Sequence, residues 1–138
     1  MEVNLGAVVA ATAAMFAVGA FWYMVPFAKK WGEIHGFDKL SAKQQKEVQS
    51  KMGPFYGVQI LVTFISAYIL AHMMMALPQV SPYQLTTWLW LGFVFPAQAS
   101  AVIFGGTEPK WMLQKIAIMA GEAWVHLLVA AWVISLFK

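Results

Sequence analysis

The sequence predicts an all-α integral membrane protein: an antiparallel bundle of four transmembrane helices, with a short interfacial helix between the first two. Four apolar stretches, at about residues 3–26, 54–77, 83–104 and 112–137, reach the ~20 residues that a helix needs to span ~30 Å of hydrocarbon. Hydrophobic residues make up 61% of the 138-residue chain and charged residues 11%, whereas a soluble domain carries about 25% charged residues. We therefore expect residues 1–138 to form a single transmembrane domain.

The first span is expected to be a retained helix and not a signal peptide. A signal peptide carries basic residues before a short apolar run, whereas here Lys29 and Lys30 follow the span. Within it, Gly6, Ala10 and Ala14 recur at intervals of four residues and so lie along one face of a helix. Small residues let helices approach closely in lipid, which predicts that this face is buried against another span.

The connection between the first two spans is predicted to contain a short helix at the membrane surface. Ser41 followed by Gln44 fits a capping box at the start of that helix. An apolar stripe opposite the lysines is formed by Phe37, Leu40, Val48 and Met52. The alternative is a solvated lysine face without a partner, which is the common outcome for a charge run.

Proline and small residues shape the remaining spans. Pro54 suits the first turn of the second span, and the proline-containing segment 77–82 predicts a tight turn into the third. Pro96 lies inside the third span, where it is expected to kink the helix, and we favour a packing adjustment over a cavity wall as the result. In the fourth span, Ala117 and Gly121 form a second pair of small residues expected to face another helix.

The lysines predict the orientation of the bundle, because the chain has no arginine. One end of the predicted bundle holds eight of the nine lysines, namely Lys29, Lys30, Lys39, Lys43, Lys46, Lys51, Lys110 and Lys115, and the other end holds Lys138. By the positive-inside rule the lysine-rich connections are cytoplasmic and both termini are external, as in a protein of the bacterial inner membrane. The formal charge of +3 then reflects topology and contact with membrane lipids, and does not indicate nucleic-acid binding.

Aromatic residues are expected to anchor the bundle at both membrane interfaces. Trp22, Tyr23, Trp31 and Trp111 fall at the lysine-rich level, and Trp132 falls near the opposite one. Tryptophan and tyrosine are enriched at these levels in membrane proteins, so anchoring is the favoured interpretation. A porphyrin or quinone box is the alternative, and the sequence identifies no cofactor.

Few polar side chains lie deep within the predicted spans. Glu122 and His126 are four residues apart in the fourth span, and therefore lie one turn apart on the same helix face. Counting the helical rise from the span ends predicts that they belong to a polar centre at mid-depth. Four further residues are expected to complete this centre. Thr12 and Thr63 are expected at a similar depth, His72 nearer the external side of the membrane and Gln98 nearer the lysine-rich, cytoplasmic side.

Glu122 admits two interpretations. An ionised carboxylate at the bilayer centre costs at least ~2.5 kcal/mol, so Glu122 is expected to point inward, to pair, or to hold a proton. The first interpretation is a proton-handling or polar-ligand site shared with His126. The second is a hydrogen-bonded clasp that fixes helix packing or a dimer contact.

The sequence does not predict a metal site or a catalytic motif. His72, Glu122 and His126 are the available ligand set, but their spacing matches neither the Glu-x-x-His elements of di-iron bundles nor the His-Glu-x-x-His motif of zinc proteases. The chain contains no cysteine, which excludes thiolate catalysis and cysteine-ligated zinc.

Short segments distributed along the whole chain resemble one known family. These segments are GAFWY at 19–23, KKW at 29–31, SAYILA at 66–71, WLGFV at 90–94, FGG at 104–106, PKW at 109–111 and AG at 120–121. In type and order they are similar to the domain-of-unknown-function 1761 family. The resemblance implies a four-helix membrane protein of bacterial type, and it brings no established activity or cofactor.

We predict a small membrane protein that binds a lipophilic or weakly polar ligand at this polar centre, or moves it across the bilayer. The first alternative is a non-catalytic accessory subunit, or one that associates with copies of itself or with a larger membrane complex. A membrane-embedded enzyme comes third.

Overall fold

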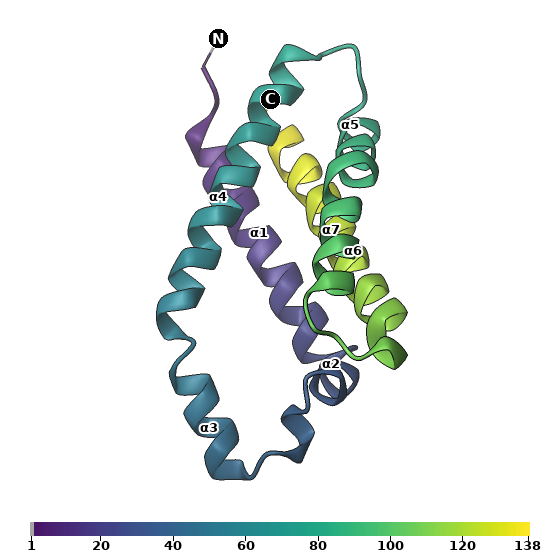
Figure 1. Ribbon diagram of the computed structural model, residues 1–138. Coiled ribbons are helices and arrows are strands. Elements are labelled where there is room, and N and C mark those ends of the chain that lie inside the picture. Colours follow the sequence, from purple (N-terminus) through teal and green to yellow (C-terminus); the bar gives the residue numbers. More distant parts are fainter. Residues whose placement is uncertain (1) are drawn as a thin grey trace.

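The computed structural model describes residues 2–138, and this part of the chain is helical without any β-strand (Figure 1). Four helical units are long and apolar enough to cross a membrane: Leu5–Met24, Gly53–Ala76, Pro82–Phe104 and Pro109–Ser135. This confirms the predicted four-helix fold, and the ends of the units fall within three residues of the predicted ranges. The chain is therefore a membrane protein with a transmembrane bundle.

The four units differ in their internal regularity. The first two are single helices, α1 (Leu5–Met24) and α4 (Gly53–Ala76). The third consists of α5 (Pro82–Leu89), a π-helical turn η2 (Trp90–Val94) and α6 (Phe95–Phe104), and the fourth consists of a 3-10 turn η3 (Pro109–Trp111) and α7 (Met112–Ser135).

Helix α7 lies at the centre of the bundle. It packs mainly against α1 on one side and against α5 and α6 on another, while α4 packs mainly against α1. Both chain termini lie at one end of the bundle, which we call the terminal end (Figure 1). The connections that carry α2 (Ala28–Ile34), α3 (Ala42–Ser50) and η3 lie at the other end, which we call the lysine-rich end.

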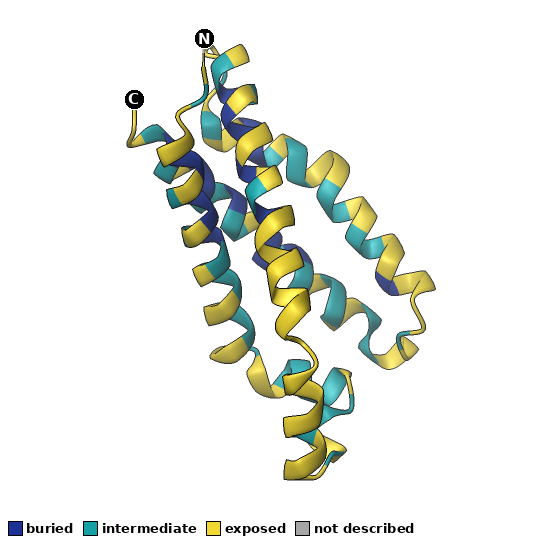
Figure 2. Ribbon diagram, turned by 90° about the vertical axis from the view of Figure 1, so that its left-hand side faces the viewer, coloured by how far each residue is buried: buried dark blue, intermediate teal, exposed yellow. Residues whose placement is uncertain are grey.

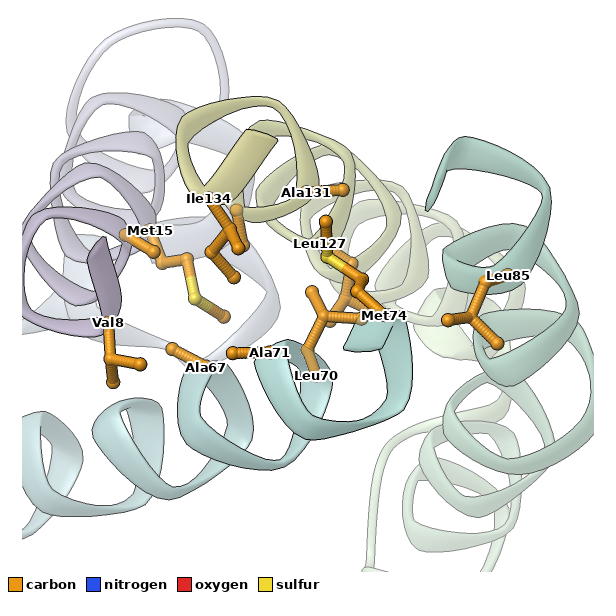
Figure 3. Close-up of a cluster of buried hydrophobic side chains, with 12 residues drawn as sticks. Val8, Met15, Ala67, Leu70, Ala71, Met74, Leu85, Leu127, Ala131 and Ile134 are labelled. Atoms are coloured by element: carbon orange, nitrogen blue, oxygen red, sulfur yellow. The ribbon is translucent and has the colours of Figure 1, made fainter. Parts of the chain in front are cut away.

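The hydrophobic core occupies the terminal end of the bundle. Its buried residues come from α1, α4, α5 and α7, and several of them converge in Figure 3. The cluster consists of Val8, Ala11, Met15, Ala67, Leu70, Ala71, Met74, Leu85, Leu127, Ala130, Ala131 and Ile134. Its many alanines allow close approach of the helix backbones, which is how spans associate when lipid is as apolar as the side chains.

Helix α4 diverges from the other spans toward the lysine-rich end (Figure 1). In α4, every residue from 53 to 62 is exposed, whereas Thr63, Ala67 and Leu70 further along the same helix are buried (Figure 2). No face of the first half of α4 is therefore buried against another helix.

The third span is interrupted where the sequence contains Pro96. The backbone N–H of Phe95 donates to the carbonyl of Trp90, five residues earlier, and this bond forms the wide π-helical turn η2. Proline has no N–H to bond the carbonyl four residues before it, so a wide turn at this point accommodates the break. The expected disturbance at Pro96 is thus a local change of helix type.

The connection between α1 and α4 contains three short helical segments where one was predicted. They are α2 (Ala28–Ile34), the 3-10 turn η1 (Phe37–Lys39) and α3 (Ala42–Ser50). The capping box is present, because Gln44 N–H donates to Ser41 Oγ at 3.2 Å and Ser41 N–H donates to Gln44 Oε1 at 3.0 Å. Helix α2 and the turn η1 were not predicted from the sequence, and both lack such a cap.

The predicted packing faces of the small residues require correction. In α1, Gly6 is exposed and Ala10 and Ala14 are half-buried, whereas the buried face contains Ala7 and Ala11. Small residues recur every four positions in both sets, so the spacing could not identify which of the two faces packs against another helix.

A similar correction applies to the fourth span. Ala117 is exposed, and only Gly121 of the predicted pair is in a close helix contact. A Cβ atom added at Gly121 would lie 3.2 Å from Cζ2 of Trp22 in α1.

Candidate functional site: the Glu122 and His126 pair in α7

The structure brings Glu122 and His126 into direct contact. Nδ1 of His126 lies 2.8 Å from Oε1 and 3.0 Å from Oε2 of Glu122, as the spacing of one helical turn allows. Glu122 is 8% exposed, and the His126 side chain is 25% exposed. One hydrogen therefore lies in this contact: either Nδ1 donates it to the carboxylate, or a protonated carboxyl group donates it to Nδ1.

Helix α1 leaves room for the carboxylate through a glycine. A Cβ atom added at Gly19 would lie 3.2 Å from Oε1 of Glu122, so a side chain at this position would crowd the pair. Tyr23, one turn further along α1, is close enough to Glu122 for an electrostatic interaction. The pair therefore lies in the contact between α1 and α7.

Two indoles from neighbouring elements hydrogen-bond to the backbone of α7 near the pair. Nε1 of Trp22 in α1 donates to the Ile118 carbonyl at 3.0 Å, and Nε1 of Trp90 in η2 donates to the Ala120 carbonyl at 2.8 Å. Both acceptors lie within one turn of Glu122, on different neighbours of α7. Trp22, predicted as an interface anchor, thus also has a packing role between helices.

Trp124 extends the contact between α7 and the third span. Its Nε1 donates to Thr87 Oγ1 at 3.1 Å, and its ring stacks on Trp90 with the centroids 5.4 Å apart. Trp90 was not predicted from the sequence to be a partner in this region. A usable signal was that Trp124 and Trp90 both lie near mid-span, where an indole N–H surrounded by hydrocarbon needs an acceptor from a neighbouring helix.

The two threonines expected at this centre bond to their own helices. Thr12 Oγ1 donates to the Val8 carbonyl at 2.7 Å, and Thr63 Oγ1 donates to the Gln59 carbonyl at 2.6 Å. Both are buried, but their donor capacity is used locally, so the structure gives neither a hydrogen bond to Glu122.

The two flanking residues form no hydrogen bond with the pair. His72 is exposed on α4, with its ring 4.6 Å from that of Tyr68 on the same helix, so the expectation that it lies in the bundle above the pair is wrong. Gln98 in α6 is half-buried, and its Oε1 accepts no hydrogen bond from residues 2–138. Of the six residues predicted for this centre, Glu122 and His126 are the two that the structure joins by a hydrogen bond.

A separate apolar groove runs between α1 and α4 and has a volume of about 670 Å³. Its lining is made of Val9, Thr12, Ala13, Phe16, Gly57, Ile60, Leu61 and Phe64. On α1, Gly19 lies one turn beyond Phe16 on the same side of the helix, but the groove and the pair share no lining residue.

Comparison with known proteins adds one finding to this geometry. The family model described as "Protein of unknown function (DUF1761)" matches residues 6–135, a range that covers all four spans except for Leu5, the first residue of α1. The chain belongs to this family. No curated protein and no solved structure matches the chain.

Family membership identifies no reaction, so the chemistry of the pair follows from its own atoms. If the carboxyl group and the imidazole share one proton, the pair has no net charge, whichever of the two groups carries that proton. A neutral pair suits a site surrounded by hydrocarbon. Among residues 2–138, no group of three or more His, Cys, Asp or Glu side chains is arranged to hold a metal ion. The pair can therefore hold a proton and fix α7 relative to α1.

The remaining anchor residues gather at the lysine-rich end, apart from Trp132, which is exposed on α7. Tyr23 packs on Trp31 with ring centroids 4.7 Å apart. Trp111 lies near two ammonium groups, those of Lys30 at 5.2 Å and Lys110 at 5.3 Å from its ring centroid.

Proposed function

We propose that this protein binds a lipophilic molecule in the groove between α1 and α4, in the bacterial inner membrane. The observation that carries the proposal is the groove itself, whose volume of about 670 Å³ lies within the range of ~300–1,000 Å³ found for small-molecule sites.

The lining selects for an apolar ligand. Ala13 and Gly57 supply the small side chains that hollow the groove, and Phe16 and Phe64 supply broad apolar walls. The hydroxyl of Thr12 donates to its own helix, so it offers no free hydrogen to a ligand. An acyl chain or a similar hydrocarbon fits this chemistry better than the weakly polar ligand we also considered from the sequence.

In this proposal Glu122 supports the site and does not line it. The pair fixes α1 against α7 through the contact at Gly19, and α1 carries half of the groove. A ligand bound in the groove does not need to reach the carboxylate.

Quenching by doxyl-stearic acid tests the proposal, because the cysteine-free chain accepts a single labelled cysteine. We expect a fluorophore on Val9→Cys at the groove to be quenched saturably in detergent. The matched control is Ile69→Cys, an exposed site on α4 outside the groove, where quenching should rise linearly with probe. Adding Ala13→Trp to the Val9→Cys protein should fill the groove and abolish saturation. Equal, linear quenching at both sites would contradict the proposal.

Self-association is the second candidate, and the exposure of residues 53–62 on α4 favours it. Val58 lies within this segment and is 56% exposed. If two copies meet here, Val58→Cys should form a disulfide-linked dimer under mild oxidation, and Ile103→Cys on α6 should not. A monomer in detergent with no crosslink at Val58 would remove this candidate.

We also propose that both termini are external and that the lysine-rich end is cytoplasmic. An alkaline phosphatase fused after Lys138 should then be active. A fluorescent protein that matures only in the cytoplasm should be bright when inserted near Lys43. The reverse pattern of reporter activity would show that the topology is inverted, and it would leave the groove proposal unchanged.

A further inference from the structure

A second cavity, of about 580 Å³, lies at the lysine-rich end of the bundle. Two segments distant in sequence form its walls: residues 33–39, at the end of α2 and in η1, and residues 105–115, between α6 and the start of α7. Figure 1 shows α2 beside the connection between α6 and α7. The cavity shares no residue with the groove or with the Glu122 and His126 pair.

Each wall turns at a glycine in the left-handed region. Gly36 has a φ of 70° and Gly106 a φ of 80°. Other residues adopt these angles rarely, so both turns are specified by the sequence. The walls therefore have a defined shape, although they consist largely of turns.

The cavity is lined by equal numbers of acidic and lysine side chains: Glu33, Asp38 and Glu108, and Lys39, Lys110 and Lys115. Some of these charges are already neutralised. Glu33 pairs with Lys30 at 3.1 Å, and Glu108 pairs with Lys110 at 3.5 Å.

The remaining lining charges have no ion-pair partner among residues 2–138: they are Asp38, Lys39 and Lys115. The ammonium of Lys115 lies 5.8 Å from the ring centroid of Trp31, which helps to hold it at the cavity. The cavity thus offers two cationic groups and one anionic group to a ligand.

His35 supplies a further acceptor. Its Nδ1 lies 2.8 Å from the Trp31 carbonyl, which can only accept, so Nδ1 carries the hydrogen of this bond. In the neutral imidazole Nε2 is then left as an acceptor. An ammonium ligand could donate one hydrogen to Asp38 and another to this nitrogen.

We propose that this cavity binds a zwitterion that carries a phosphate and a primary ammonium group. Lys39 and Lys115 bind the phosphate, and Asp38 together with His35 binds the ammonium. An anion alone would leave Asp38 without a partner and close to a like charge, whereas a quaternary ammonium has no N–H to donate. Two sources present the required chemistry: the headgroup of phosphatidylethanolamine, and free glycerophosphoethanolamine.

Native mass spectrometry of the detergent-solubilised protein tests this site. The probes are phosphatidylethanolamine, phosphatidylcholine and phosphatidylglycerol with identical acyl chains, and free glycerophosphoethanolamine. We expect saturable binding of one phosphatidylethanolamine, roughly tenfold tighter than of the other two lipids, since hydrogen bonds between charged groups are worth about this factor or more. Saturable binding of glycerophosphoethanolamine would identify a soluble ligand, and binding of the lipid alone would identify the headgroup.

Variants assign the binding to the cavity. Asp38→Asn should remove the preference for phosphatidylethanolamine over phosphatidylglycerol, and Lys115→Gln should weaken both by a similar factor. Lys43→Gln, on the exposed surface of α3 and outside the cavity, is the matched control and should leave all affinities unchanged. Equal affinity for the three lipids, or a preference that survives in Asp38→Asn, would overturn the proposal. The groove experiment uses other residues and a probe without an ammonium group, so the two proposals can fail independently.

Discussion

Helices α1, α4 and α7 extend through both the terminal end and the lysine-rich end of this bundle, but α4 is closely packed only at the terminal end. At the terminal end, α1, α4 and α7 bring alanines together and bury them. At the lysine-rich end, α4 has no buried residue between positions 53 and 62, and charged side chains surround a cavity. The comparison indicates that one end supplies stability and the other supplies surfaces that a ligand can reach.

The largest effect is expected from overpacking the terminal end. Ala130 is fully buried in the core, so Ala130→Leu should lower the free energy of unfolding by about 3 kcal/mol, because close-packed helices must separate to admit the longer side chain. The matched change Ala20→Leu, at an exposed position of α1 toward the other end, should have an effect below ~0.5 kcal/mol. Unfolding by sodium dodecyl sulfate in mixed micelles measures both. Equal losses would mean that the two ends are equally packed.

A smaller loss is expected at Gly121, where α7 meets Trp22. Gly121→Leu should destabilise the bundle by about 2 kcal/mol, because the new side chain must displace the indole and break its bond to Ile118. Leu136→Ala, at the exposed position that directly follows α7, serves as the control in the same unfolding assay. If the two variants unfold alike, α7 is not packed against Trp22.

The indole of Trp90 should contribute less than these steric contacts. Trp90→Phe removes the N–H that donates to the Ala120 carbonyl, and hydrogen bonds between spans are worth about 0.6 kcal/mol on average. Trp88→Phe changes an exposed indole of the same span and should be neutral. A loss for Trp88→Phe as large as for Trp90→Phe would show that the interhelical bond is not the cause.

The smallest effect is expected for Glu122→Gln. The amide keeps the size of the side chain and can still hydrogen-bond to His126, so the free energy of unfolding should change by less than ~0.5 kcal/mol. Glu122→Leu keeps the bulk but leaves Nδ1 of His126 without a hydrogen-bond partner, and should cost about 1–3 kcal/mol. If the glutamine variant loses as much as the leucine variant, the charge of Glu122 matters beyond its hydrogen bond.

Features confined to one helix were predictable from the sequence. The four spans follow from long apolar stretches, the capping box from Ser41 and Gln44, and the contact of Glu122 with His126 from a spacing of four residues. Each depends on neighbours along the chain.

Features that depend on the rotation of one helix against another were not predictable. Ala7 and Ala11 repeat at the same interval as Gly6 and Ala10, so two packing faces were equally consistent with the sequence. The bond between Trp22 and Ile118 joins residues 96 positions apart, and no local pattern indicates it. The same uncertainty of rotation placed His72 inside the bundle when it lies outside. It also left the groove between α1 and α4 unforeseen, since a groove depends on two faces at once.

The π-helical turn at Trp90–Val94 has a consequence for how the third span can change. A wide turn inserts one extra residue into the helical repeat, which shifts the angular position of everything that follows by about 100°. The residues of α5 and those of α6 therefore follow two different helical phases, and each presents its own face to α7. Loss of one residue within the turn would rotate α6 relative to α5 while leaving the length and hydrophobicity of the span almost unchanged. A chain with such a deletion would still have four apolar segments long enough to cross a membrane, but its third span would pack differently on α7 near Trp90.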